Sequence, residues 1–156
     1  MGLLLESDDY LLTEGGDHFL LEIGHSRGSY STLPGDDSEL ETPYQDSDLV
    51  KIAVDDADMV SQSAIDEFAL HQFKIDATGK NYVNLTWTGQ SNIAPSHSTV
   101  YLQIYDYTLG SWTTIDSELL AAADTDFTLA PPPVTPLDDY KDADGIMAIR
   151  VYQEAK

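Results

Sequence analysis

Carboxylates are the side chains of this sequence best suited to hold a metal ion. An acidic run before the last apolar segment supplies four of them: Asp138, Asp139, Asp142 and Asp144. Carboxylate oxygens suit Ca²⁺, but an EF-hand loop would need an oxygen ligand where Tyr140 stands and a glutamate where Val151 stands. The run therefore predicts a solvated acidic turn, with an irregular Ca²⁺ site as the alternative. No other cofactor is expected.

The histidines do not suggest a catalytic group. His18, His25, His71 and His97 occur in unrelated contexts, and the sequence has no Gly-x-Ser-x-Gly motif to supply a nucleophile. The absence of cysteine also removes thiolate metal sites and cysteine nucleophiles. We therefore predict no catalytic residues and expect a protein that is not an enzyme.

Three tyrosines could form a ligand platform. Tyr101 and Tyr105 lie in the alternating segment Thr99 to Tyr105, so both would point to one face of a strand, and Tyr107 follows at the expected bend. Exposed together, they would offer rigid rings with polar tips to a sugar or a protein partner. We favour the alternative that the other sheet or the N-terminal residues cover this face.

The net charge limits the possible partners. The chain has 7 Lys and Arg against 28 Asp and Glu, a formal charge of −21. Such a surface repels phosphate backbones and anionic lipids, so no nucleic-acid or membrane partner is expected. The first residues, Met1 to Glu6, lack the basic region of a signal peptide. We expect synthesis in a cytoplasm.

From Glu67 to Tyr152 the pattern favours an antiparallel β-sandwich or jelly roll. Short runs in which apolar and polar residues alternate are separated by turn residues, which is typical of such folds. The predicted strands are residues 68–75, 82–88, 99–105, 112–115, 127–129 and 146–152, with a hairpin turn over 106–111.

The remaining segments of this region are assigned as follows. Leu49 to Val54 is predicted as a short strand, and Asp55 to Ala64 as a polar connection with at most one helical turn. Ser117 to Ala123 is predicted as a helical turn with Ser117 as its N-cap. Trp87 and Trp112 are expected to be core residues from adjacent strands.

The N-terminal residues form a short repeat with a period of eight. Each unit has an apolar run, a glutamate and turn residues, as in Leu3-Leu4-Leu5-Glu6-Ser7-Asp8. Units this short cannot bury their own apolar side chains and need a partner surface. We predict an extended arm of short strands that docks through Leu4, Leu5, Leu11, Leu12, Phe19, Leu20 and Leu21. The alternative is a hairpin that folds back and completes the chain's own sheet.

The resulting organisation has three parts. Residues 1–25 form the arm, residues 26–48 form a polar linker or loop rich in Gly, Pro, Ser and Asp, and residues 49–156 form the β-sandwich.

These features together resemble tailed-bacteriophage virion proteins. The repeats look like the LLLEDG-type leaders of such proteins. Four segments are similar to their jelly-roll modules, and also to galactose-binding-like and carbohydrate-binding sandwiches: Val83 to Gly89, Val100 to Tyr105, Ser111-Trp112 and Ile149 to Tyr152.

The resemblance implies a structural protein of the virion, in head decoration, head–tail connection or the tail. Its partners would be other virion proteins and sister subunits in a homo-oligomer. The alternative function is a carbohydrate- or cell-surface-binding β-sandwich module.

Overall fold

The computed structural model describes residues 2–5, 22–52 and 59–155, and these residues form an all-β fold. All strand pairs among these residues are antiparallel, so the predicted all-β, antiparallel class is confirmed. The larger sheet has the order β3-β2-β5-β10-β7-β8, formed by Thr42–Pro43, Glu22–Tyr30, Phe68–Asp76, Ile146–Glu154, Val100–Asp106 and Ser111–Glu118. The smaller sheet has the order β4-β1-β6-β9, formed by Val60–Ser63, Gly2–Leu5, Trp87–Ser91 and Phe127–Leu129.

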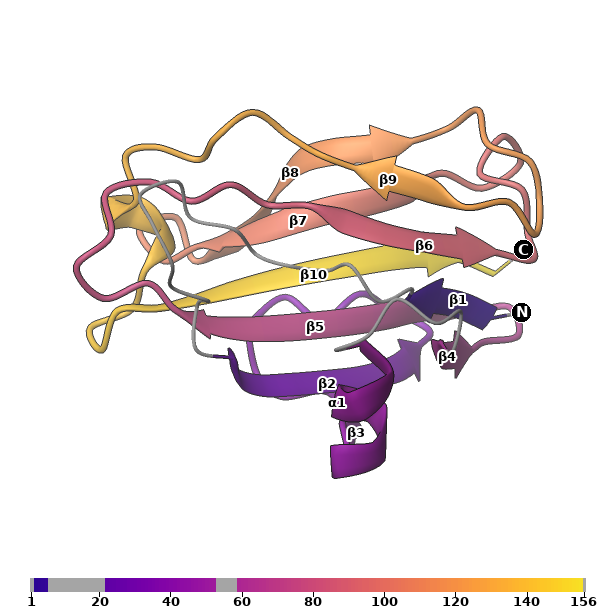
Figure 1. Cartoon of the computed structure of the whole chain (residues 1–156), viewed down its shortest axis with the longest axis horizontal. Helices are drawn as coiled ribbons and strands as arrows, with labels where there is room; N and C mark the ends of the chain where they lie inside the picture. Colours follow the sequence, from indigo (N-terminus) through magenta and orange to yellow (C-terminus); the bar gives the residue numbers. More distant parts are fainter. Residues whose placement is uncertain (1, 6–21, 53–58, 156) are drawn as a thin grey trace.

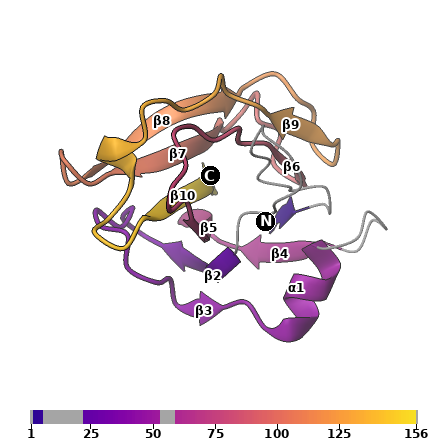
Figure 2. The ribbon, with the colours of Figure 1, turned by 60° about the vertical axis from the view of Figure 1, so that its left-hand side comes forward.

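The two sheets contribute to one hydrophobic core. Its residues include Trp87 and Leu129 from the smaller sheet and Leu102, Ile104 and Ile149 from the larger one. Figures 1 and 2 show β6 and β9 on one side of this interior and β7 and β10 on the other. Two antiparallel sheets that share a core are what a sandwich architecture requires.

Alternation correctly located three long strands. The predicted strands over 68–75, 99–105 and 146–152 correspond to β5, β7 and β10, and the turn between β7 and β8 is a hairpin with Gly110 at a φ of 66°. On β10, however, both faces are buried: Ile149 is 2% exposed and Arg150, which points the other way, is 4% exposed. The face of the larger sheet that points away from the core, called the outer face below, is therefore partly covered.

The first part of the predicted linker is a strand. Residues 26–30 belong to β2, which pairs with β5 from Glu22 to Tyr30, and residues 42–43 form β3. The linker prediction over 26–48 is wrong for these residues. Ser26, Gly28 and Ser29 give β2 no apolar alternation, although its position between β3 and β5 supplies the hydrogen bonds of a strand.

Three local assignments are also corrected. Residues 46–52 form the helix α1 (Asp46–Ile52) in place of a strand from Leu49, and the carboxylate of Asp48 accepts a hydrogen bond from the backbone N–H of Gln45. Residues 60–63 form β4 and not a connection. At 117–118, β8 continues to Glu118, whose carboxylate then accepts the N–H groups of Leu120 and Ala121. The remaining short helix is η1 (Asp138–Tyr140).

The strand predicted over 82–88 begins later than expected. Val83 makes an isolated bridge with Val134, and β6 runs from Trp87 to Ser91. Val83, Leu85 and Trp87 are nevertheless all buried, as their alternation predicted. Trp112 is not a core residue, because it lies in β8 of the other sheet and on the outer face.

The first strand occupies an interior position in its sheet. β1 pairs with β4 through Leu5 and Val60, and with β6 through Leu5 and Gly89. The backbone of Leu4 and Leu5 thus pairs within the chain, which is the arrangement of the fold-back alternative. The other predicted docking residues (Leu11, Leu12, Phe19, Leu20 and Leu21) lie outside the described residues.

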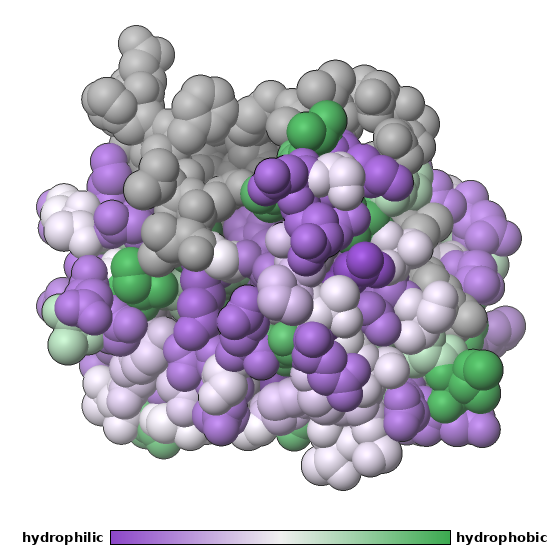
Figure 3. All heavy atoms as spheres, turned by 90° about the horizontal axis from the view of Figure 1, so that it is seen from below, coloured by the Kyte–Doolittle hydropathy of each residue, from purple (hydrophilic) through white to green (hydrophobic). Residues whose placement is uncertain are grey.

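The charged composition is visible on the surface. On the face shown in Figure 3, most of the described residues are hydrophilic and the apolar ones are scattered. Within the described ranges, no helix has the length and hydropathy to cross a membrane.

The core model predicts a specific loss of stability. Ile104 is fully buried between the sheets, so Ile104→Ala should lower the free energy of unfolding by about 2–5 kcal/mol in urea titrations. Leu120→Ala is the control, because Leu120 is 81% exposed and its removal should change stability by less than about 0.5 kcal/mol. Equal effects of the two changes would contradict the assigned core.

Candidate binding face of the six-stranded sheet

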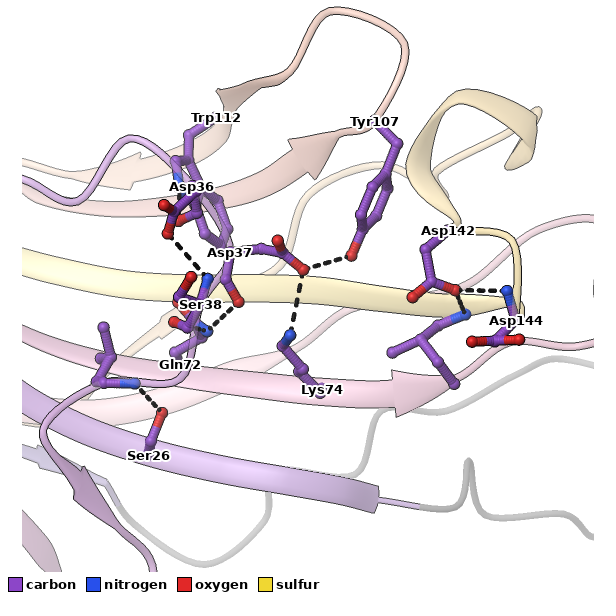
Figure 4. A network of polar contacts seen from close by, with 12 residues as sticks. Ser26, Asp36, Asp37, Ser38, Gln72, Lys74, Tyr107, Trp112, Asp142 and Asp144 are labelled. Atoms are coloured by element: carbon purple, nitrogen blue, oxygen red, sulfur yellow. Dashed lines mark hydrogen bonds and ion pairs between the residues drawn. The ribbon is translucent and has the colours of Figure 1, made fainter.

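Residues 31–41, called the covering segment below, cross the outer face of the larger sheet. The segment follows β2 and is bonded to side chains of several strands, as Figure 4 shows. At its end, Leu40 is buried and its backbone N–H donates to Ser26 Oγ at 3.0 Å, while the N–H of Glu41 donates to the Tyr30 hydroxyl. The small residues of β2 leave room for this crossing.

Asp37 is the main polar anchor of the covering segment. One carboxylate oxygen accepts from Lys74 Nζ at 3.2 Å and from the Tyr107 hydroxyl at 2.8 Å. The amide of Gln72 donates to the backbone oxygens of Asp37 and Ser38 at 3.0 and 2.9 Å. Side chains from β5 and from the β7–β8 turn therefore fix the same two residues.

Arg150 holds the other end of the segment. Its guanidinium donates to the backbone oxygen of Pro34 at 2.7 Å and to Gln103 Oε1 at 2.8 Å. It also lies 4.2 Å from the centre of the Trp112 ring and 5.5 Å from that of Tyr152. Burial lowers the pKa of Arg150 to about 10, so the group is charged at neutral pH.

Beside the covering segment the outer face contains an aromatic hollow of about 440 Å³. Tyr101 and Tyr152 stack with ring centres 5.1 Å apart, and Phe68 meets Tyr152 edge to face. Burial raises the pKa of the Tyr152 hydroxyl, so this ring is neutral at physiological pH. The lining residues are Leu33, Phe68, His97, Ser98, Thr99, Tyr101, Tyr152 and Glu154.

The predicted tyrosine platform is split by the structure. Tyr101 lines the hollow, but Tyr105 is 9% exposed and packs against Tyr107 and Trp112. Tyr107 is engaged by Asp37. A platform of all three side chains is therefore wrong. Two of the three tyrosines are covered, but the expected source of the cover is wrong. Asp36 and Asp37 of the covering segment, which belongs to the predicted linker, bind Trp112 and Tyr107, whereas the other sheet or the N-terminal residues were expected.

Phe68 and Tyr152 were missed as site residues. Both residues lie in segments that were predicted as strands. The alternation of side chains along those strands assigns each of them to the face opposite the core. Their neighbours could not be assigned, because the strand order that places β10 between β5 and β7 does not follow from the sequence. Aromatic residues at the ends of three such strands are the signal that could have been used.

The acidic run of residues 138–144 is a turn that binds its own backbone. Asp142 Oδ1 accepts the N–H groups of Asp144 and Ile146, both at 2.9 Å, and Asp139 accepts from the Thr108 hydroxyl at 2.7 Å. The structure shows no group of three or more possible metal ligands among the residues it describes. The bonds of Asp142 are those of an acidic turn.

Two of the described histidines share one aromatic cluster, and the third lines the hollow. His71 is fully buried and its Nδ1 is bonded to the Tyr44 hydroxyl, while His25 is buried with its ring edge against Phe73. His97 is exposed at the edge of the hollow, and His18 lies outside the described residues. Tyr44 contacts both His25 and His71, with ring centres 5.6 and 5.9 Å apart.

Comparison with known proteins assigns neither a family nor a function to the chain. No protein-family model, curated protein or solved structure matches the chain.

The Asp37–Tyr107 contact predicts an alkaline loss of stability. Burial and the neighbouring carboxylate raise the pKa of Tyr107 above 10, its ordinary value. Above pH 10 the unfolded chain ionises this hydroxyl while the folded chain keeps its proton, so the free energy of unfolding should fall as pH rises. Urea midpoints measured from pH 8 to 11 should fall less steeply in Tyr107→Phe.

Tyr107→Phe and the unmodified protein are compared by how steeply the urea midpoint falls with pH, and not by the midpoint itself. Tyr107→Phe also removes a hydrogen bond, which lowers stability at every pH. Leu120→Ala, which changes an exposed side chain that does not ionise, is the control and should keep the slope of the unmodified protein. Parallel pH profiles for Tyr107→Phe and the unmodified chain would exclude the proposed contact.

Proposed function

We propose that this chain is a non-enzymatic structural protein of a tailed-bacteriophage particle. Its β-domain is displayed, and its N-terminal residues dock on neighbouring subunits in head decoration, head–tail connection or the tail. The observation that carries the proposal is the N-terminal repeat, whose leucines cannot be buried by units of this length alone.

The position of β1 allows docking by strand exchange, although within one chain it matches the fold-back alternative. β1 lies between β4 and β6 and pairs with both, so its displacement would leave an open slot in the sheet. The same slot accepts the equivalent strand of a second copy without any new type of contact. Many copies in a particle would add such contacts together.

The arrangement of the described polar residues supports a non-enzymatic role. The carboxylates of Asp37, Asp142 and Glu118 are bonded to the protein's own loops, and His71 is bonded inside the core. For these side chains, bonds that stabilise the fold support a structural role over a catalytic one.

Particle composition tests the proposal. Mass spectrometry of purified particles, from a phage whose genome encodes this chain, should detect the chain in multiple copies. Complete absence of the chain from the particles would refute the proposal.

A paired substitution separates docking from folding. Leu20→Ser with Leu21→Ser changes one repeat and keeps β1, so it should reduce the amount of this protein in particles at least tenfold. The matched control is Leu119→Ser with Leu120→Ser, since both leucines are exposed after β8, and incorporation should then stay within about twofold. Unchanged incorporation of the repeat variant would exclude the docking role.

A further inference from the structure

We propose that the aromatic hollow on the outer face binds a neutral saccharide. The hollow is formed by residues of one folded chain. The saccharide proposal can therefore be correct or wrong independently of the proposed structural role in a phage particle. The proposal rests on four properties of the hollow: its size, its aromatic wall, the charge of its lining and its rigidity.

The size and wall suit a sugar. Small-ligand sites have volumes of roughly 300–1,000 Å³, and the hollow of about 440 Å³ lies within this range. Phe68, Tyr101 and Tyr152 come from three adjacent strands and give it a continuous aromatic side. The carbon-bound hydrogens of a pyranose ring pack well on such rings, while tyrosine hydroxyls can bond to sugar hydroxyls.

The polar part of the lining completes this match. His97, Ser98, Thr99 and Glu154 also line the hollow and contribute polar atoms to it, although the Ser98 hydroxyl already donates to the backbone oxygen of Glu154 at 2.6 Å. A saccharide presents hydroxyl groups around an apolar ring, which suits this combination of polar and aromatic neighbours.

Charge selects a neutral ligand over an anionic one. The lining contains the carboxylate of Glu154 and neither lysine nor arginine, and the whole chain carries −21. Phosphorylated ligands and acidic sugars would therefore be repelled. Arg150 is charged and lies 5.5 Å from the centre of the Tyr152 ring, but it does not line the hollow, and its donors to Pro34 and Gln103 are not available to pair with an anionic ligand.

The hollow is held in shape before any ligand arrives. On one side, Arg150 fixes the backbone of Pro34, next to the lining residue Leu33. On the other side, fully buried Gln153 donates to the backbone oxygens of Ile93 and Ser98, at 3.0 and 2.7 Å. Both anchors are on β10, so one strand sets the distance between the two edges. A preformed site loses less free energy to ordering on binding.

Binding to a printed array of neutral and acidic glycans tests the inference with the full chain. We expect signal on a group of neutral glycans, followed by titration calorimetry with the strongest of these as a free saccharide. Tyr101→Ala should weaken binding at least about tenfold, the equivalent of 1.4 kcal/mol. Tyr82→Ala, a partly buried tyrosine outside the hollow, should change it less than twofold.

Two further measurements guard against a folding defect. Circular dichroism would show whether Tyr101→Ala is folded, and His97→Ala changes an exposed side chain at the edge and should also weaken binding. Chemical-shift changes on adding the saccharide should concentrate at residues 97–101 and 152–154 and at Leu33.

Several results would overturn the proposal. An array silent for all glycans would do so, as would shift changes elsewhere or binding unaffected by both Tyr101→Ala and His97→Ala. Preference for acidic glycans would refute the charge argument. Binding of a proline-rich peptide at these residues, with no glycan bound, would assign the hollow to a protein partner in place of a sugar.

Discussion

Arg150 places a positive charge on an interior strand of the larger sheet, and the arrangement of the outer face depends on satisfying that charge. A buried guanidinium is costly unless its donors find acceptors and its surface is packed. Here Gln103 and the backbone of Pro34 accept its hydrogen bonds, and Trp112 covers its face. These contacts draw residues 31–41 across the sheet. They also explain why Trp112, apolar by composition, lies outside the core.

Several of the few basic side chains of this acidic chain connect separate segments of the fold by hydrogen bonds and ion pairs. Lys74 binds Asp37 across the outer face, and Arg27 reaches the backbone oxygen of Ser61 and the carboxylate of Asp48. Several carboxylates have a different role, since they accept backbone N–H groups within their own turns, as Asp36 does from Ser38 and Asp76 from Thr78. These bonds hold the pKa values of Asp36 and Asp76 below the usual range. Part of the negative charge therefore comes from aspartates that stabilise turns, and these residues do not by themselves indicate a metal or a basic partner.

The sequence was informative wherever one side of a strand faces the core. Alternation alone placed Leu102, Ile104 and Ile149 inside and Tyr101 outside, because a pleated strand has a fixed period of two. It was uninformative for β2, whose small polar residues lie beneath the covering segment, and for α1, where the acidic start at Asp46 and Asp48 was a better guide than the apolar residues.

The site was harder to predict than the fold for a related physical reason. Alternation tells which way a side chain points but not what covers it. Tyr107 is bonded to Asp37 of the covering segment and Tyr105 packs against Tyr107 and Trp112, while Tyr101 lines the hollow. That outcome depends on contacts between residues far apart in the sequence, such as Pro34 with Arg150.

The proposed docking strand and the proposed saccharide site lie on different sheets. β1 belongs to the four-stranded sheet, whereas the hollow lies on the outer face of the six-stranded sheet, and the shared core separates them. Figure 1 shows β1 and the C-terminal end of β10 toward the same end of the molecule. A neighbouring subunit that exchanged β1 would pair with β4 and β6 and would leave Tyr101 and Tyr152 uncovered. The two roles are therefore compatible in one assembled copy, with the core as the rigid layer between them.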